Sequence, residues 1–293
     1  MMRPRLAISF SGGRSSAVML KLCLEKYSKT HDILITFANT GCEHEETLRF
    51  VDAVDRHIAD GKVVWIEAEI HGKGKGPTAK VVTFETASRN GEPFEAAIAK
   101  HGVFCRTHPQ CTSRLKEEPM ISYRRSQGWT AGSYDTAIGI RADEIDRCSS
   151  KAKEKRFIYP LVEAGYGKEQ VNLYLQQFDW DLKIPNDAYG NCVWCWKKSQ
   201  RKLMTLAQDD PAIFDLPGNM ERTYGMVNNG KTEQTEPRVF FRGRKSAQDI
   251  LKLSQTEEFE RYVDAEYHQR ELFDPDLDVG GGCGESCEIG ADE

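Results

Sequence analysis

A short glycine-rich segment near the N-terminus has the residue types of an anion-binding turn. It reads Ser-Gly-Gly-Arg-Ser-Ser over residues 11–16 and follows an apolar run at residues 6–10. Adjacent glycines let the backbone turn tightly and approach a ligand closely, and a helix that begins after them offers free amides and a positive end. Serine hydroxyls and the Arg14 guanidinium add donors suited to oxyanions. The segment therefore predicts a phosphate or sulfate site, although a strand–helix turn with serine caps has the same composition.

The cysteines form a second set of reactive side chains, and there are nine of them. Cys192 and Cys195 have the Cys-x-x-Cys spacing that zinc sites, iron–sulfur sites and redox dithiols share. Cys105 and Cys111 lie upstream on either side of His108 and are the candidate partners of that pair. The N-terminus has no export signal, so we expect a reducing, cytoplasmic environment in which thiols serve as metal ligands, redox groups or core residues.

The elements that must position these groups alternate between strand and helix patterns. Apolar runs predict strands at residues 6–10, 33–37, 63–66 and 137–140. Helical spacing predicts helices at about residues 17–27, 45–58, 94–101, 112–127, 167–178 and 194–208. This alternation predicts a doubly wound, mostly parallel α/β sheet with right-handed crossovers. A nucleotide- and metal-binding domain is placed at residues 1–208, an irregular, mainly helical extension at 209–274, and a flexible Gly-rich, acidic tail at 275–293.

Bulk composition is that of an ordinary globular chain. The sequence has 293 residues, of which 29% are charged and 39% hydrophobic, and its formal net charge is −5. No apolar run approaches the roughly 18 residues that span a bilayer, so no membrane association is expected. Basic runs at residues 151–156 and 197–202 fit either a solvated helix face or contacts to a nucleic acid. Trp194 and Trp196 would stack on bases in the second case, but core positions beside a metal site are favoured.

Several segments, in order along the chain, resemble motifs of the phosphoadenylyl-sulfate (PAPS) reductase and ATP pyrophosphatase superfamily. Residues 11–16 resemble its PP-loop, and residues 37–41, with Glu43 and Glu46 behind them, resemble the motif after the second strand of PAPS reductases. Residues 111–119 resemble their Cys–Arg–Lys–Pro segment, residues 139–144 with Arg147 resemble their Gly-Ile-Arg signature, and Tyr159-Pro160-Leu161 and Cys192-Val-Trp-Cys195 complete the series. The resemblance covers about residues 5–205 and implies a Rossmann-like fold of the adenine nucleotide alpha-hydrolase type.

The resemblance also implies which residues hold an adenine nucleotide at the carboxyl edge of the sheet, where open α/β sheets bind ligands. Residues 37–41 would flank adenine and ribose, and three cations would neutralise phosphate or sulfate, since guanidinium matches tetrahedral oxyanions. Ion pairing of these cations with neighbouring acids is the alternative. The implied contacts are Ser11, Gly12, Gly13, Arg14, Ser15, Ser16, Phe37, Asn39, Thr40, Gly41, Arg114, Lys116, Gly139, Ile140 and Arg141, and Arg141 is also assigned to catalysis.

Relatives that carry a four-iron, four-sulfur (4Fe-4S) cluster have two adjacent cysteines upstream of their Cys-x-x-Cys, whereas Gln110 precedes Cys111 here. The resemblance therefore leaves two ligand sets open. Either Cys105, Cys111, Cys192 and Cys195 bind the cluster, or the last three bind it and leave one iron open to substrate or sulfide, as in some tRNA-thiolating relatives. His108 could replace a thiol. A cluster is favoured over zinc and over a site without metal.

The tail cysteines, Cys283 and Cys287, supply a catalytic hypothesis. PAPS reductases have a nucleophilic cysteine on a mobile C-terminal tail that attacks the sulfate sulfur and forms a thiosulfonate, which a second thiol can resolve. The usual Glu-Cys-Gly-Leu-His ending is absent here, and the acidic neighbours Glu285 and Glu288 disfavour a thiolate. A tail with idle thiols is the alternative.

Together the motifs favour PAPS reductase-like chemistry, in which PAPS or its analogue adenosine 5′-phosphosulfate (APS) is reduced to sulfite by a thioredoxin-like reductant. The alternative is an ATP pyrophosphatase that adenylates and thiolates tRNA, DNA or a small molecule. The intact glycine pair favours that alternative, but Ser15 replaces the acid common in such loops, which argues against a Mg²⁺ site. A non-catalytic, cluster-bearing nucleotide or nucleic-acid binding protein is the second alternative. A homo-oligomer is expected.

Overall fold

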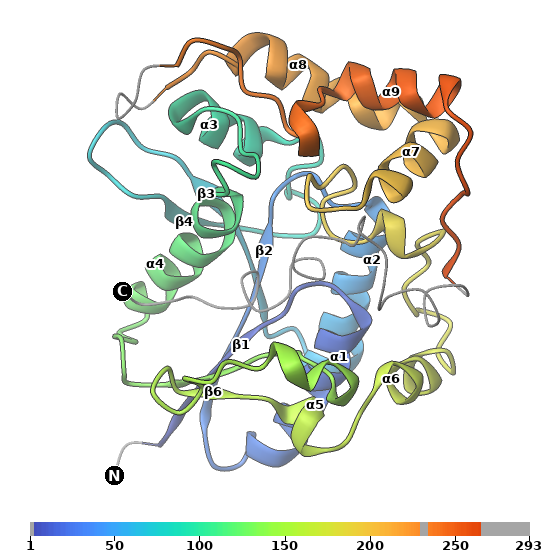
Figure 1. Ribbon diagram of the computed structural model, residues 1–293. Helices are drawn as coiled ribbons and strands as arrows, with labels where there is room; N and C mark the ends of the chain where they lie inside the picture. The colour runs from blue at the N-terminus through green and yellow to red at the C-terminus, as the bar shows by residue number, and fades with distance from the viewer. Residues whose placement is uncertain (1–2, 229–233, 265–293) are drawn as a thin grey trace.

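The computed structural model describes residues 3–228 and 234–264, and its centre is a six-stranded sheet (Figure 1). The strands are β1 (Arg5–Ser9), β2 (Asp32–Asn39), β3 (Val63–Glu69), β4 (Thr78–Val82), β5 (Asp135–Ala137) and β6 (Phe157–Ile158), in the order β4-β3-β2-β1-β5-β6. Neighbouring strands run parallel, except that β4 is antiparallel to β3. The chain builds outwards from β1 on one side and then returns to its other side at β5. Such a reversal leaves a crevice at the carboxyl ends of β1 and β5, where ligands of open α/β sheets bind.

Helices cover both faces of this sheet. They are α1 (Arg14–Tyr27), α2 (Glu45–Val54), α3 (Glu92–His101), α4 (Glu118–Ser126), α5 (Pro160–Glu163), α6 (Lys168–Leu175), α7 (Gln200–Asp209), α8 (Asp215–Tyr224) and α9 (Ala247–Thr256). Helices α1 and α2 share a hydrophobic cluster with Ile8 and Trp65, while Met120 of α4 packs with Ala38 and Ile66. Because successive strand residues point to opposite faces, these two clusters lie on opposite sides of the sheet. The predicted doubly wound α/β architecture is confirmed.

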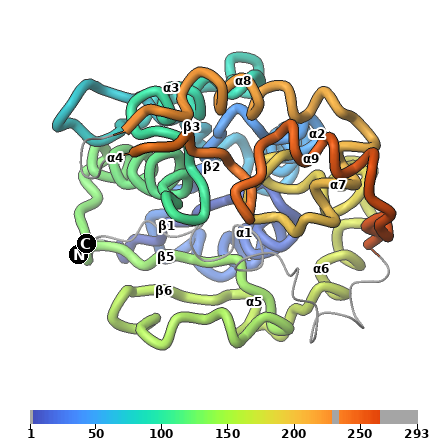
Figure 2. The backbone as a smooth tube through the Cα atoms, turned by 45° about the horizontal axis from the view of Figure 1, so that its top comes forward, coloured from blue at the N-terminus to red at the C-terminus, as the bar shows by residue number. Residues whose placement is uncertain are grey.

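Helices α7, α8 and α9 group with α3 at one end of the molecule, as Figures 1 and 2 show. One hydrophobic cluster joins them and contains Phe94, Trp194, Leu203, Phe214 and Phe240. Trp194 and Trp196 are 3% and 4% exposed, so both are core residues, as predicted, and neither presents a ring to solvent. The predicted domain division after residue 208 stays a prediction, and this cluster contains residues from both sides of it.

The predicted strands at residues 6–10, 33–37 and 63–66 correspond to β1, β2 and β3, but the strand predicted at 137–140 is misplaced. Strand β5 ends at Ala137, which pairs with Ile8 near the end of β1. Ile138 and Ile140 are buried in a separate hydrophobic cluster instead. These residues are apolar because they are buried beyond the end of the strand, not because they belong to it.

The helix predicted at 194–208 begins late, because α7 starts only at Gln200. Ser199 is its N-cap, and the Ser199 hydroxyl accepts a hydrogen bond from the Lys202 amide. Residues 192–198 form turns, with the Cys195 amide bonded to the Cys192 carbonyl and the Lys198 amide bonded to the Cys195 carbonyl. The helix predicted at 167–178 ends at residue 175, and the helices predicted at 45–58 and 112–127 each contain a five-residue π-helical segment, at 55–59 and 113–117.

Candidate functional site

The glycine loop connects β1 to α1 at the crevice of the sheet. Gly12 has a φ of +81°, and a Cβ atom there would lie 3.1 Å from methyl groups of Thr47 and Val51. Glycine is therefore the residue that fits this tight, left-handed turn. Gly13 is the N-cap of α1 without a side-chain cap, and the first turn of the helix has no acidic residue. The first amides of α1 are thus open to an anion, and no carboxylate competes for the positive end of the helix.

Polar side chains of the loop hold its shape and connect it to a distant segment. The Ser16 hydroxyl donates to the Gly13 carbonyl at 2.9 Å and accepts from the Ser11 hydroxyl at 2.9 Å. Arg14 makes an ion pair with Asp181 at 2.9 Å and donates to the Leu182 carbonyl at 2.6 Å. Ser11, Ser16 and Arg14 therefore stabilise the loop and tie it to the segment after α6.

A cavity of about 980 Å³ opens in front of the glycine loop. Its volume is that of a site for a small molecule or cofactor. Its walls come from segments that are distant in sequence. They are residues 11–16, 139–147, 167–172, 182–191, 195–202 and 262–264, together with Thr47. The predicted residues Ser11, Gly12, Gly13, Arg14, Ser15, Ser16, Gly139, Ile140 and Arg141 all line it.

Arg141 reaches across this cavity towards the glycine loop. It precedes the short helix η3 (Ala142–Arg147), and its guanidinium forms an ion pair with Asp143 at 2.9 Å. The same guanidinium lies 3.4 Å from Glu144 and 3.5 Å from the Ser15 hydroxyl. Arg141 therefore bridges the β5 and β1 sides of the crevice while it is ion-paired with its neighbouring acids. The Arg141–Asp143 bond and charge also keep the pKa of Asp143 below its usual value, although burial opposes this.

The other implied nucleotide contacts do not line this cavity. Phe37 is 1% exposed and packs edge-on against Trp65, with ring centroids 4.9 Å apart. Asn39 is buried, and its amide donates to Glu67 at 2.7 Å. Gly41 lies against Gly91, and Arg114 makes an ion pair with Glu118. Phe37, Asn39 and Gly41 thus support the loops of the site from within, and Arg114 is paired with Glu118 away from the cavity lining.

Three thiols lie around a second, much smaller cavity of about 20 Å³. Cys111, Cys192 and Cys195 line it together with Lys116 and Thr40. The Lys116 ammonium is 3.9 Å from the Glu43 carboxylate, and the Lys116 side chain is 10% exposed. The structure therefore places Lys116 and Thr40 beside the thiols and not in the glycine-loop cavity.

The backbone around Glu43 explains why these thiols meet. The Glu43 carboxylate accepts hydrogen bonds from the amides of Thr40 and Cys42 at 3.0 and 3.2 Å. Glu43 also forms an antiparallel bridge with Cys192, and the Val193 amide donates to the Cys42 carbonyl. The loop after β2 is thereby joined to the Cys-x-x-Cys segment. Cys23 and Cys42 are buried in the core and do not line the thiol cavity.

Burial dominates the electrostatics of the thiol cavity. It raises the pKa of Cys192 to about 12, with a further upward contribution from Glu43 and an opposing one from Lys116. Burial alone would lower the pKa of Lys116, but its neighbours Cys192 and Glu43 outweigh burial and raise it. An ammonium held next to three thiols favours negative charge on sulfur or on a group that the sulfurs bind.

Cys105 stands apart from the other three predicted metal ligands. It forms a tight turn with His108, and its sulfur lies 3.3 Å from the Thr107 hydroxyl. His108 contacts the His101 carbonyl through Nε2 at 2.9 Å. Within residues 3–228 and 234–264, no three His, Cys, Asp or Glu side chains are arranged to hold a single metal ion. Cys111, Cys192 and Cys195 nevertheless line one cavity, although they are not arranged around a single ion. Cys283 and Cys287 lie outside the described residues.

Cys195 belongs to the walls of both cavities. It lines the small thiol cavity and also the large cavity that contains the glycine loop. Lys197, Lys198 and Lys202 line the large cavity beside it. These lysines belong to the basic run at 197–202 of the sequence, and the structure adds that they line the same cavity as the glycine loop.

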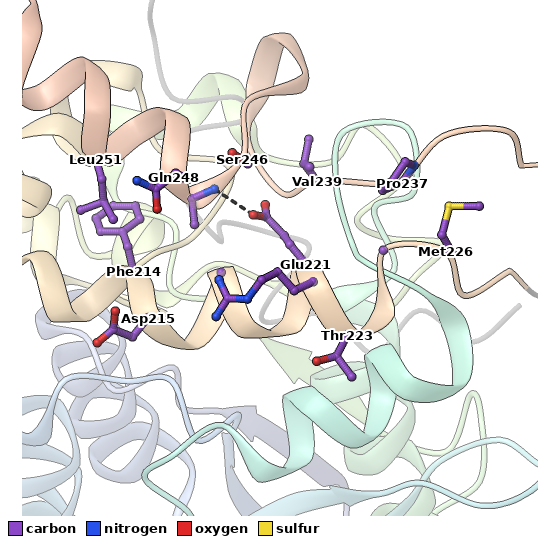
Figure 3. Close-up of a pocket in the computed structure, with 14 residues that line it drawn as sticks. Phe214, Asp215, Glu221, Thr223, Met226, Pro237, Val239, Ser246, Gln248 and Leu251 are labelled. Carbon is purple, nitrogen blue, oxygen red and sulfur yellow. Dashed lines mark hydrogen bonds between the residues drawn. The ribbon is translucent and has the colours of Figure 1, made fainter.

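A further cavity of about 690 Å³ lies between α8, α9 and residues 237–246, and shares no lining residue with the other two (Figure 3). The Glu221 carboxylate points from α8 to the first turn of α9 and accepts from the Ala247 amide at 2.9 Å. It also accepts from the Phe240 amide at 2.8 Å. Burial raises the pKa of Glu221 to about 7, although both backbone hydrogen bonds oppose the shift. This carboxylate fastens α9 to α8.

Comparisons with known proteins bear on this arrangement. The model of the phosphoadenosine phosphosulfate reductase domain matches residues 5–156. An uncharacterized nin region protein of Escherichia phage lambda is 33% identical over 96% of this chain and 94% of its own length. An uncharacterized protein of Methanocaldococcus jannaschii is 30% identical over 76% of this chain, which spans only 42% of that protein.

A structural comparison finds a phosphoadenylyl-sulfate reductase from Candida auris, in its phosphate complex, with a TM-score of 0.32 and 18% identity over 59% of this chain and 72% of that one. In the part of the chain that the structure describes, no helix is long and apolar enough to cross a membrane.

Proposed function

The chain belongs to the phosphoadenosine phosphosulfate reductase domain family, and from this premise we propose that it is a sulfonucleotide reductase-like enzyme. The large cavity binds an adenine nucleotide, PAPS or APS, with a phosphate on the amides of the glycine loop. One observation carries the proposal: the cavity that contains the glycine loop also contains Cys195, which belongs to a cluster of three thiols. Phosphate binding and sulfur chemistry thus have adjacent sites.

We assign a 4Fe-4S cluster to Cys111, Cys192 and Cys195. Thiolates are the ligands that such clusters use, and these three share one cavity with a buried cation that suits an anionic group. The cluster would supply redox or Lewis-acid chemistry next to the nucleotide. Lys116 would offset its negative charge, and the buried Trp194 and Trp196 would exclude water from it.

Cys283 and Cys287 remain the proposed nucleophile and resolving thiol. The described chain ends at Asp264, whose carboxylate accepts from the Asp187 amide at 2.9 Å and lines the large cavity. A thiolate would attack the sulfur of the phosphosulfate, forming an S–S bond while the O–S bond to the nucleotide phosphate breaks. Attack by the second thiol would release sulfite and leave a disulfide, which a thioredoxin-like dithiol would reduce.

An ATP pyrophosphatase that modifies tRNA, DNA or a small molecule is the second candidate. The intact turn at Gly12, with an uncapped first turn of α1, favours this candidate because it suits a polyphosphate. The missing acid in that turn argues against a Mg²⁺ ion held there.

Assays with both nucleotides separate the candidates. Anaerobically purified protein is mixed with PAPS or APS plus thioredoxin, and with ATP in the presence and absence of RNA or DNA. Sulfite release that Cys283→Ser and Cys287→Ser abolish, and Cys148→Ser preserves, supports the reductase. Pyrophosphate release without sulfite would transfer the proposal to the pyrophosphatase, and neither activity alongside nucleotide binding would leave a non-catalytic binding protein.

A further inference from the structure

Arg124 of α4 is a buried cation without a carboxylate partner. The residue is only 1% exposed, and its Nη2 atom donates to the Ser9 hydroxyl at 2.8 Å. The guanidinium also lies 5.4 Å from the centroid of the Tyr134 ring. Within residues 3–228 and 234–264 it makes no ion pair, and its Nε and Nη1 atoms have no hydrogen-bond partner. A buried charge without a counter-charge destabilises the fold, so a benefit elsewhere has to offset it.

Packing alone does not require a guanidinium at this position. Met120, one turn earlier in α4, packs against the same sheet through apolar contacts with Ala38 and Ile66. A well-packed apolar side chain in place of a buried charge is often neutral or stabilising. The cost of burying Arg124 therefore indicates a role that its charge performs.

The contact with Ser9 places this charge beneath the glycine loop. Ser9 is the last residue of β1, and the loop begins two residues later at Ser11, so the two Cα atoms lie within about 7 Å of each other. Arg124 is buried and does not line the large cavity, so it does not touch a ligand there. Its field nevertheless reaches the loop, because charges in the interior are screened much less than charges in solvent.

Two arginines that do line the cavity differ from Arg124 in their pairing. Arg14 makes an ion pair with Asp181, and Arg141 makes one with Asp143. Each pair leaves little net charge to attract an anion, whereas Arg124 has no acidic partner in the part of the chain that the structure describes. The first amides of α1 and Arg124 thus both favour an anion at the loop, the amides by direct contact and the guanidinium through space.

We propose that Arg124 is the buried counter-charge of the anion that the glycine loop binds. The inference rests on the proposed function, because it needs an anionic group at that loop, and it deepens that function by naming a positioning residue outside the cavity. Before binding, the charge is offset by the Ser9 hydroxyl and the Tyr134 ring. A phosphate on the loop amides adds a full counter-charge across the end of β1. Part of the affinity thus comes from the relief of an unpaired buried charge.

Titration with adenosine and AMP tests this role, because the two ligands differ by the charged phosphate. In the wild type we expect AMP to bind more tightly than adenosine. Arg124→Met and Arg124→Gln remove the charge and should each weaken AMP binding by about tenfold, as for a charge at about 10 Å in a protein interior, while adenosine stays within about twofold. Arg124→Lys keeps the charge and should keep AMP within about threefold of the wild type.

Arg125→Met is the matched control on the same helix. Arg125 is exposed, so its replacement changes the net charge equally but removes a charge that solvent screens, and AMP affinity should stay within about twofold. Urea unfolding without ligand gives an independent readout. At least one of the two charge-free variants should be as stable as the wild type or more stable, because the unpaired buried charge is gone.

The outcomes separate this role from the proposed function. Equal weakening of adenosine and AMP, or no recovery in Arg124→Lys, would show that Arg124 acts through packing and would overturn the inference. Failure of both charge-free variants to fold, or lower stability of both, would do the same. If the wild type binds neither AMP nor APS, the proposed function fails, and equilibrium dialysis with labelled inorganic phosphate at constant ionic strength tests the counter-charge alone. Saturable phosphate binding that Arg124→Met weakens and Arg125→Met retains supports it, whereas no saturable binding by the wild type refutes it.

Discussion

Gly12 is the residue on which the shape of the glycine loop most directly depends. Gly12→Ala introduces a Cβ in a left-handed conformation, 3.1 Å from Thr47 and Val51. We expect a loss of about 1–2 kcal/mol in the free energy of unfolding and roughly tenfold weaker nucleotide binding. Gly13→Ala is the control, because Gly13 has an extended backbone and its Cβ would meet only the Ser11 hydroxyl, at 3.9 Å. Equal effects of both substitutions on thermal unfolding and on affinity would show that the turn does not need Gly12.

The positions of Cys111, Cys192 and Cys195 around one cavity predict which cysteines bind iron. Cys111→Ser, Cys192→Ser and Cys195→Ser should each lose most bound iron and acid-labile sulfide after anaerobic reconstitution, because these three thiols line one cavity. Cys105→Ser should retain both, since its sulfur contacts Thr107 in a separate turn. Iron loss in Cys105→Ser comparable to that in Cys111→Ser would instead restore the ligand set with four cysteines. Folding of each variant is checked by circular dichroism.

Sequence motifs located several residues that line this cavity but could not give the direction of every side chain. The glycine loop and Arg141 were recognisable because a fixed turn and an adjacent helix leave a local pattern. Lys116 was assigned to phosphate but lies beside thiols, since a motif names a residue without the direction of its side chain. Lys198 and Lys202 were visible only as a basic run, because their burial depends on packing against Tyr262 and the turn at Cys192.

Helices and strands could be predicted where a local sequence pattern defines them, and were missed or misplaced where contacts between distant residues define them. Strands β1 to β3 were predicted because buried parallel strands read as apolar runs. Strand β4 was missed, since it lies at the sheet edge with Lys80 and Val81 exposed, and β6 has only two residues. The start of α7 was misplaced because the buried Trp194 and Trp196 continue a helical pattern that the turns around Cys195 interrupt. The pattern of apolar residues in a sequence indicates which residues are buried. Where a helix or strand begins and ends depends instead on its capping residues and on its hydrogen-bond partners.

An ion pair between Arg14 and Asp181 connects α1 to the segment after α6. Asp181→Asn removes the carboxylate that pairs with Arg14, in a contact where the side chains are 16% and 30% exposed. We expect a loss of about 1–2 kcal/mol in unfolding free energy and weaker nucleotide binding, since the cavity wall at Leu182 is no longer fixed. Glu25→Gln is the control on α1, because the exposed Lys21–Glu25 pair contributes only about 0.5 kcal/mol or less. Unchanged affinity in Asp181→Asn would show that the wall does not need this pair.

At the scale of the whole molecule, Glu221 links the stability of the C-terminal helices to pH. Its pKa is about 7 in the folded protein against 4.5 for an ordinary glutamate, so the folded state binds more protons between these values. The stabilising contribution is complete below pH 4.5 and is lost as pH rises through 7. Urea unfolding should therefore show a decline over this window of at most about 3 kcal/mol from this group. Glu221→Gln should flatten the decline, whereas Glu154→Gln, at an exposed position, should leave it unchanged. An unaltered slope in Glu221→Gln would assign the pH dependence to other groups.

The cavity has walls from two distant halves of the chain, and this has a consequence for synthesis. The glycine loop and Arg141 lie within residues 5–156, while Cys195 and Lys198 follow the last strand of the sheet. A ribosome that has released all six strands has therefore made only one side of the site. Nucleotide captured by a nascent chain at that stage would meet the amides of α1 but not the Cys-x-x-Cys segment. For the proposed enzyme, the order of synthesis would therefore delay reactivity until the chain beyond residue 202 has emerged, after the part that would bind the nucleotide.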